Sequence, residues 1–481
     1  METKVLKVFG FIVVLALVLG ACTPAPPPAP PPEEVTEEVV SEPPTEAPPP
    51  EEATEEVVSE ATEEVAAEPV EMVIGWWGEQ EAPGMSDWFD ESIAMFQETH
   101  PNVKIEQVLE STENLAPSFQ AAAAANEGPD IYTPWPGAWT VEDAAAGYYL
   151  PLNDYLPQET IDTLNEGVRP DRSFRGKLYG YPLYMSAGVI AYNKALFEQA
   201  GLDPEKPFET WEELIAGCEK LKAAGITPFT FGWKDAWISD WFWAGWGVKM
   251  MNSVSDMIPL FTGEASANDP MYRDWLDRIY ELQTKGCLND DVGSLEMSQG
   301  VDSIAAGNGA MSMVPDNTLA FLKEKMGDDL GVMPTPTFGT GKLADATCIG
   351  SSGGLSIPTW SNDPVVAGEF VDFLLSEERV NAFFDQVGVI PLSSRFDGSQ
   401  LEPGSVSSMQ YDILTAKPIT FCPSLFTPVQ VNEQGTYIAG QEVALGTMTP
   451  EEAAKLIDEV ILQWRTENPD KLEQLIEWLS Q

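Results

Sequence analysis

The stretch that decides the fold is residues 71–110, EMVIGWWGEQEAPGMSDWFDESIAMFQETHPNVKIEQVLE. Its first and last segments have the apolar or alternating composition of β-strands. Between them, Trp88, Phe89, Ile93 and Phe96 recur at a spacing that places them on one face of a helix, which a proline then ends. A strand, a helix and a second strand in succession predict an α/β fold.

The alternation continues along the chain. APSFQAAAAANEG is typical of a second helix, and PDIYTPW of a strand that runs into a loop. In an open sheet of this kind, ligands bind beyond the carboxyl ends of the strands. We therefore expect Trp76, Trp77, Glu79 and Trp135 on the ligand side. Capping-box patterns at Thr210 and in MTPEEAA, residues 448–454, predict two later helices.

The first 22 residues, METKVLKVFGFIVVLALVLGAC, have the composition of an export signal. Two lysines precede an uncharged apolar run, residues 8–19, that is shorter than the ~20 residues a membrane-spanning helix needs. The ending LGAC resembles a bacterial lipobox. We expect residues 1–21 to be a lipoprotein signal peptide and Cys22 to be the lipidated first residue of the mature chain. An ordinary cleavage site before a cysteine is the alternative.

Residues 23–70 hold 13 prolines and 14 glutamates, with no lysine, arginine or aromatic residue. Such a segment cannot bury enough apolar surface to offset the entropy lost on folding. Because it is rich in proline and repels itself, it should behave as an extended spacer. We expect residues 22–70 to be the lipidated cysteine and a disordered stalk that holds a folded body away from a membrane.

The body, residues 71–481, is longer than one core usually supports, which predicts two lobes. The net charge of the whole chain is −52, and −39 remains on the body after the +1 of the signal and the −14 of the stalk are removed. So acidic a surface repels nucleic acid and anionic lipid, and is compatible with neutral or cationic ligands.

Four cysteines follow Cys22, and this even number in an exported chain predicts two disulfides. Their spacing leaves all three pairings open. The cysteines are Cys218, Cys287, Cys348 and Cys422.

Several motifs occur in the order seen in one known family. They are PNVKIE, GPDIY, GKLYGYPL with IAYNKALFEQAGL, TWEEL, GAMSM, LGVMPTP and AGEFVDFLLSEE. From about residue 72 to 465 the chain resembles the family 1 extracellular solute-binding proteins, the maltose-binding-protein-like sugar-binding subunits of ABC importers. The resemblance implies a two-lobed, type II periplasmic-binding-protein (Venus-flytrap) fold with two or three hinge crossings. The implied lobes are 71–183 plus 308–357, and 184–307 plus 358–481.

The resemblance also implies ligand-binding positions. Two loops contact sugar in the family. Here the first contains Glu79, beside Trp77, and the second contains Trp135. Ser186, near Tyr184, stands where maltose-binding members carry a carboxylate, which argues against a maltodextrin ligand.

A tryptophan-rich segment, FGWKDAWISDWFWAGWG at 231–247, matches the family segment that supplies a carboxylate and, two residues later, an aromatic ring. Indole rings four residues apart share one predicted helical face, and two more lie on another. We expect one face to contact ligand and the other to pack in the core. The expected ligand residues are Trp233, Asp235, Trp237 and Trp241, and the expected core residues are Trp243 and Trp246.

The sequence differs from the family at Ser186, and it differs again after GAMSM. There the family commonly shows Gly-x-Trp, and this chain has Val-Pro-Asp-Asn. Either Asp316 and Asn317 hydrogen-bond the ligand in place of stacking, or the loop lies away from the cleft.

The implied function is a lipid-anchored, monomeric, extracytoplasmic receptor on the cell membrane. It would capture a mono- or oligosaccharide and deliver it to ABC transporter permease subunits, without enzymatic activity, cofactor or metal. A receptor for a polyamine or another cation is the first alternative, because acidic residues interleaved with tryptophan suit cation–π contacts. A sugar site would mix carboxylates with Asn, Lys or Arg, whereas a polyamine site would be almost purely acidic and aromatic.

Two weaker alternatives are a tryptophan-lined glycoside hydrolase and a surface adhesin. Two catalytic carboxylates leave no local signature, so motifs alone do not exclude the hydrolase. The chain has one histidine, His100, and no zinc-ligand spacing or G-x-S-x-G motif.

Overall fold

The computed structural model describes residues 68–79, 82–111, 114–166, 168–416 and 418–481. The chain divides into two units, Met1–Glu64 and Val65–Gln481, and the described residues all belong to the second. The expected signal peptide, Cys22 and nearly all of the expected stalk lie outside the described residues.

The stretch 71–110 folds as its pattern predicts. Strand β1 (Val70–Trp76) lies between β2 (Val103–Leu109) and β3 (Ile131–Tyr132) in a parallel sheet, with Ile74 opposite both Gln107 and Ile131. Helix α1 (Met85–Thr99) connects β1 to β2, and α2 (Leu115–Ala125) connects β2 to β3. The apolar face of α1 is buried as expected, including Trp88 and Phe96.

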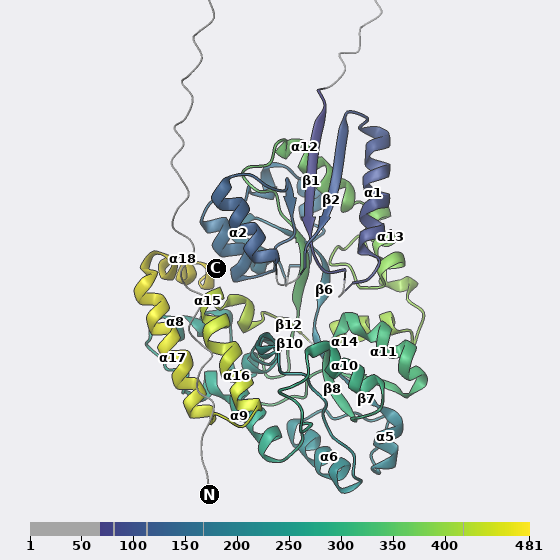
Figure 1. Ribbon diagram of the computed structural model, residues 1–481, viewed down its shortest axis with the longest axis vertical. Coiled ribbons are helices and arrows are strands. Elements are labelled where there is room, and N and C mark those ends of the chain that lie inside the picture. Colours follow the sequence, from purple (N-terminus) through teal and green to yellow (C-terminus); the bar gives the residue numbers. More distant parts are fainter. Residues whose placement is uncertain (1–67, 80–81, 112–113, 167, 417) are drawn as a thin grey trace, which may run out of the picture. The chain divides into compact units, whose positions relative to one another are not determined.

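Two helices from much later in the chain complete this first lobe. Helices α12 (Pro364–Leu374) and α13 (Glu377–Val387) pack against α1 (Figure 1). The indole of Trp88 donates a hydrogen bond to the carbonyl of Arg379 at 3.0 Å, and its ring lies 5.0 Å from that of Phe383. The implied lobe boundaries had placed these residues in the second lobe.

The second lobe is built around a three-stranded antiparallel sheet. Strand β7 (Gly188–Asn193) lies between β8 (Met311–Pro315) and β9 (Leu330–Met333). The implied boundaries had placed 308–357 in the first lobe, but β8 and β9 pair with β7. Because sheet pairing joins residues far apart in sequence, local patterns do not reveal it.

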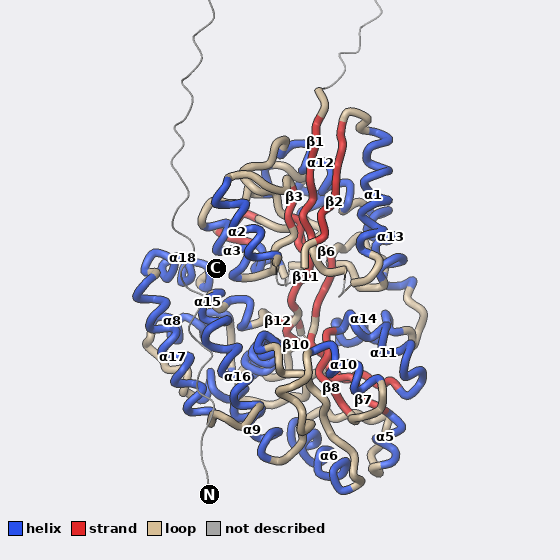
Figure 2. The backbone as a smooth tube through the Cα atoms, in the orientation of Figure 1, coloured by secondary structure: helices blue, strands red, loops and turns tan. Residues whose placement is uncertain are grey.

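The lobes are joined by extended chain. Strand β6 (Tyr181–Ser186) pairs antiparallel with β11 (Gly350–Leu355), and β6 continues through Ala187 directly into β7. Figure 2 shows this pair of strands running down the middle of the described chain. The chain also passes between the lobes after α13, to reach α14 (Val406–Ala416). The two-lobed architecture with multiple crossings agrees with expectation.

The remaining described helices and strands have the following bounds: α3 (Ala138–Ala145), α4 (Gln158–Ile161), β4 (Ser173–Phe174), β5 (Lys177–Leu178), α5 (Lys194–Gln199), α6 (Trp211–Ala223), α7 (Ser239–Phe242), α8 (Ile258–Thr262), α9 (Pro270–Thr284), α10 (Met297–Ala305), α11 (Leu319–Met326), β10 (Thr347–Cys348), β12 (Ile419–Thr420), α15 (Val429–Val431), α16 (Tyr437–Ala444), α17 (Pro450–Glu467) and α18 (Pro469–Leu479). None of the described helices is long and apolar enough to cross a membrane.

Two disulfides form, as expected, and the structure selects one of the three pairings. Cys218 of α6 joins Cys287, which follows α9, and Cys348 of β10 joins Cys422. The first bond lies in the core of the second lobe, where both cysteines are fully buried.

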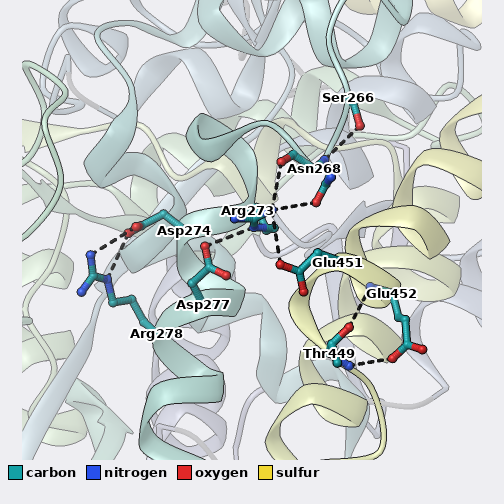
Figure 3. Close-up of polar contacts among 9 residues, drawn as sticks. All are labelled: Ser266, Asn268, Arg273, Asp274, Asp277, Arg278, Thr449, Glu451 and Glu452. Atoms are coloured by element: carbon teal, nitrogen blue, oxygen red, sulfur yellow. Dashed lines mark hydrogen bonds and ion pairs between the residues drawn. The ribbon is translucent and has the colours of Figure 1, made fainter.

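Both expected capping boxes are present. The Thr210 hydroxyl accepts a hydrogen bond from the Glu213 amide at the start of α6, and Thr449 does the same for Glu452 at the start of α17. Figure 3 shows the second box beside Arg273 of α9, whose guanidinium lies 3.6 Å from Glu451 and 3.2 Å from Asp277. These contacts fix the first turn of α17 against α9.

Candidate ligand-binding cleft

A cavity of about 470 Å³ opens between the two lobes. Its aromatic wall residues are Trp77, Trp135, Trp139, Trp237, Trp241 and Tyr437. Its polar wall residues are Ser186, Asp240, Thr335, Thr347, Ser424 and Glu433. A volume of this size suits a ligand of one to a few rings.

The first lobe contributes three indole rings. Trp77 follows β1, is 3% exposed, and donates its N–H to the carbonyl of Thr133 at 2.8 Å. Its ring meets that of Trp135 edge-on at 5.5 Å, and Trp135 meets Trp139 edge-on at 5.0 Å. Edge-to-face packing fixes neighbouring rings at an angle, so the three indoles form a shaped surface.

A fully buried arginine supports the loop that carries two of these rings. The Arg172 guanidinium donates to the carbonyl of Pro134 at 2.8 Å and to the hydroxyl of Thr140 at 3.1 Å. The Thr140 hydroxyl donates in turn to the carbonyl of Trp135 at 2.6 Å. Burial lowers the pKa of Arg172 to about 10, so the guanidinium stays charged at neutral pH.

The second lobe contributes the tryptophan-rich segment. It forms a short 3₁₀ turn (Ala236–Ile238), the single turn α7, and a π-helical turn (Trp243–Gly247), instead of one regular helix. The rings of Trp237 and Trp241 meet edge-on at 5.4 Å on the cavity wall.

The other three indoles of this segment pack in the core. Trp233 donates its N–H to the Ser239 hydroxyl at 3.0 Å, and Trp243 donates to the Thr427 hydroxyl at 3.0 Å. Trp246 is 1% exposed, and the expected core placement of Trp243 and Trp246 is confirmed.

Two carboxylates face the cavity from the second lobe. Asp240 accepts hydrogen bonds from the Ser424 hydroxyl at 3.0 Å and from the Tyr437 hydroxyl at 3.2 Å. Burial raises the pKa of Asp240 to about 6. Glu433 lies four residues before Tyr437, one helical turn away, and burial together with repulsion from Glu142 raises its pKa.

The charged groups of the polar wall are acidic, and the rest of it consists of hydroxyl groups. Among the described residues that line the cavity, none is Lys, Arg, His, Asn or Gln. The disulfide Cys348–Cys422 also lies in the wall, and it joins β10 to the segment that follows β12 and carries Ser424.

The residues expected to bind ligand fall into two groups. The structure brings together on the cavity wall Trp77, Trp135, Ser186, Trp237 and Trp241. The remaining expected residues, Glu79, Tyr184, Trp233, Asp235, Asp316 and Asn317, are not among the described residues that line the cavity.

Two of this second group are held by contacts outside the cavity. The Glu79 carboxylate caps α1 by accepting from the amides of Gly84 and Ser86, each at 2.9 Å. Tyr184 is fully buried, with its ring 6.0 Å from Phe383.

The other four are buried or hydrogen-bonded to neighbouring residues. Trp233 is buried in the core, and Asp235 accepts from the amide of Met297 at 3.1 Å. Asp316 accepts from the amide of Ala187 at 2.9 Å, between β6 and β7, and Asn317 is buried beside it. Met313 and Pro315 do line the cavity, but the Asp316 and Asn317 that follow are not among the described lining residues.

The cavity also contains residues that sequence reasoning missed. Trp139 lies four residues after Trp135, a spacing that could have indicated it, and Asp240 stands inside the tryptophan-rich segment. Ser424, Glu433 and Tyr437 lie about 190 residues later in the chain, and no local pattern connects them to Asp240.

Comparisons with known proteins agree with this geometry. Residues 82–380 match the family described as bacterial extracellular solute-binding protein. An uncharacterized ABC transporter extracellular-binding protein of Pyrococcus horikoshii is 26% identical over 326 residues, which cover 66% of this chain and 70% of that protein. An sn-glycerol-3-phosphate-binding periplasmic protein of Shigella flexneri is 27% identical over 221 residues, covering 45% of this chain and 50% of that one.

Solved structures share the fold. A chitin oligosaccharide binding protein superposes with a TM-score of 0.70 and 22% identity, covering 82% of this chain and 98% of that chain. From the family match and the shared two-lobed fold, the chain belongs to the bacterial extracellular solute-binding proteins, whose members bind solutes and are not enzymes.

Proposed function

We propose that this chain is the sugar receptor of an ABC importer, capturing a mono- or oligosaccharide in the cleft and delivering it to the permease subunits. The observation that carries the proposal is the pair of indole-lined walls, one from each lobe, around a cavity with a few polar groups. A pyranose ring has an apolar C–H face that stacks on indole, and its hydroxyls can donate to Asp240 and Glu433.

The placement of the walls explains how capture would work. Trp77, Trp135 and Trp139 belong to the first lobe, and Trp237, Trp241 and Asp240 to the second. A ligand that contacts both walls stabilises the state in which the lobes are close together. The permease would recognise that state, and a separate ATPase subunit would supply the energy for transport.

The chemistry of the wall argues against an anionic cargo. The sn-glycerol-3-phosphate-binding relative is named for a phosphate ester, which proteins hold with arginine, lysine or helix amino termini. The described lining of this cavity has two carboxylates and no basic side chain. The chitin oligosaccharide binding protein of the same fold provides the nearer chemical parallel.

Membrane attachment belongs to the same proposal. The lipobox-like LGAC would place a lipid on Cys22, and residues 23–70 would act as the spacer between the membrane and the cleft. Metabolic labelling with palmitate tests this point. Label should enter the parent protein and be lost in Cys22→Ala, and equal labelling of both would overturn it.

A thermal-shift screen of the full chain tests the sugar assignment. Ligands that bind only the native state raise its stability, by ~2.7 kcal/mol at a ligand concentration 100 times the Kd. Mono- and oligosaccharides should raise the melting temperature at both low and high salt. A panel of sugars without any effect would overturn the proposal.

A cationic solute such as a polyamine is the second candidate, because one specific observation favours it. The cavity wall is acidic and aromatic without basic or amide side chains, as a polyamine site would be. A shift caused by spermidine alone, and weakened by salt, would replace the sugar by a polyamine while leaving the fold and family unchanged.

A further inference from the structure

We infer that the cleft recognises a saccharide that carries a protonated amine, with Asp240 and Glu433 forming the ammonium subsite and the indole rings binding the sugar. This inference rests on the proposed function and specifies its substrate class. It combines two independent observations on one cavity, the aromatic walls and the uncompensated carboxylates.

The hydrogen bonds of Asp240 differ from those of Asp130 and Glu142. Asp130 accepts from the amides of Val73 and Asn362, and Glu142 accepts from Lys471 and a backbone amide. Asp240 has two neutral hydroxyl donors, Ser424 and Tyr437. A carboxylate removed from water is normally paired with a cation or several N–H donors.

Glu433 adds a second negative charge to the same wall. Its carboxylate forms no hydrogen bond or ion pair with the described residues, and repulsion from another carboxylate, Glu142, contributes to its raised pKa. Glu142 is already neutralised by Lys471 at 3.0 Å. The cavity wall therefore carries a half-buried carboxylate, Asp240, and a solvent-exposed one, Glu433, and no described lining residue is basic. A ligand ammonium group would supply the counter-charge.

The aromatic rings on the cavity wall indicate which apolar group the ligand carries besides the amine. Trp241 directly follows Asp240, and Trp237 precedes it by one helical turn, so an ammonium group at Asp240 lies within reach of an indole face. Trp135 and Trp139 of the first lobe are partly exposed on the cavity wall, and they offer an apolar surface that a thin polyamine chain would leave largely uncovered. A sugar ring covers that surface, and an amine on the ring satisfies the carboxylates.

Calorimetric titration of the full chain at pH 6.5 separates the possibilities. The four ligands are a glucosamine tetramer with free amines, its N-acetylated counterpart, cellotetraose and spermidine. We expect the free-amine tetramer to bind at least tenfold more tightly than either neutral tetramer, with an affinity that falls as salt rises from 50 to 500 mM.

Variants identify the groups responsible. Asp240→Asn keeps the shape and one acceptor oxygen but removes the charge, and a hydroxyl of Ser424 or Tyr437 can turn to accept from the new amide. It should abolish the tenfold preference, because it weakens binding of the free-amine tetramer more than binding of the neutral tetramers. Glu433→Gln should reduce the preference in the same direction and serves as the second variant if Asp240→Asn fails to fold. Glu459→Gln, on the exposed face of α17, makes the same change in net charge and should have no effect.

The outcomes distinguish this inference from the proposed function. Neutral tetramers that bind as tightly as the free-amine tetramer, in the parent and in Asp240→Asn alike, would overturn the ammonium subsite and leave the sugar receptor standing. Binding of spermidine alone, or of none of the four ligands, would overturn the sugar assignment as well.

Discussion

At the scale of single residues, Asp240 makes the stability of the protein depend on pH. Its pKa is about 6 in the folded chain, against 3.8 for the ordinary side chain. Between these values the folded state binds more protons than the unfolded state, so this group's contribution to stability falls as pH rises from about 4 to 6 and is constant above. The raised pKa therefore makes the folded protein more stable in mild acid.

We predict that Asp240→Asn gains stability relative to the parent as pH rises from 4 to 7, by at most about 3 kcal/mol for a shift of this size. Urea unfolding of both proteins at several pH values measures the difference. The buried carboxyls of Asp143 and Asp316 also have raised pKa values, about 7 each, but they are common to both proteins and cancel. A difference that does not change with pH would contradict the assignment.

Gly137 determines how closely the two cavity walls approach. Its φ is 69°, and a Cβ built there would lie 2.1 Å from the carbonyl oxygen of Leu425, beside Ser424. We predict that Gly137→Ala weakens ligand binding at least tenfold, because the loop carrying Trp135 and Trp139 must move away from the opposite wall.

Gly147→Ala is the matched control for this test. Gly147 has a similar φ of 83°, but its added Cβ would meet no atom within 4 Å. It should cost stability through the backbone without altering affinity. Equal losses of affinity in the two variants would show that backbone strain, and not the approach of the walls, is responsible.

At the scale of structural elements, the two disulfides should have separable roles. Cys348–Cys422 ties β10 to the segment that carries Ser424, whereas Cys218–Cys287 lies in the core. We predict that the double variant C348S/C422S loses ligand affinity several-fold, since Ser424 and hence Asp240 are held less firmly. Both double variants should lose ~2–5 kcal/mol of stability.

The comparison is made by titrating ligand into each double variant under conditions where both are folded. C218S/C287S should keep the affinity of the parent. A loss of affinity in both variants would indicate a general loosening of the second lobe instead of a local one.

The capping box at α17 is a second test at this scale. Thr449→Ala should destabilise the protein by about 1 kcal/mol, because the amide of Glu452 loses its acceptor at the helix start. Thr449→Ser keeps the hydroxyl and should be nearly neutral. Urea unfolding monitored by tryptophan fluorescence measures both, and equal losses in the two variants would count against the cap.

At the scale of the whole molecule, sequence reasoning succeeded where structure is local. The alternation in 71–110, the helical face of α1 and the two capping boxes follow from neighbouring residues, and the structure contains them. The π-helical turn at Trp243–Gly247 was not predicted, because its rings pack against segments such as Trp275 and Thr427 that lie far away in sequence.

The lobe boundaries and half of the cavity escaped prediction for the same reason. Strands β8 and β9 join β7 from more than 100 residues away, and α13 returns to α1 after nearly 300. Asp240 meets Ser424 and Tyr437 only in the folded chain. A sequence pattern within one segment cannot identify contacts with residues that come close only when the chain folds.

The wall disulfide has a consequence for when the receptor becomes functional. Cys348 and Cys422 are 74 residues apart in the sequence. Disulfides form in oxidising compartments, whereas the cytosol keeps cysteine thiols reduced. A copy still inside the cell would therefore have an untethered cavity wall. The chain would thus reach its full ligand affinity only after export. Newly made receptors inside the cell would then not sequester ligand that has already been imported.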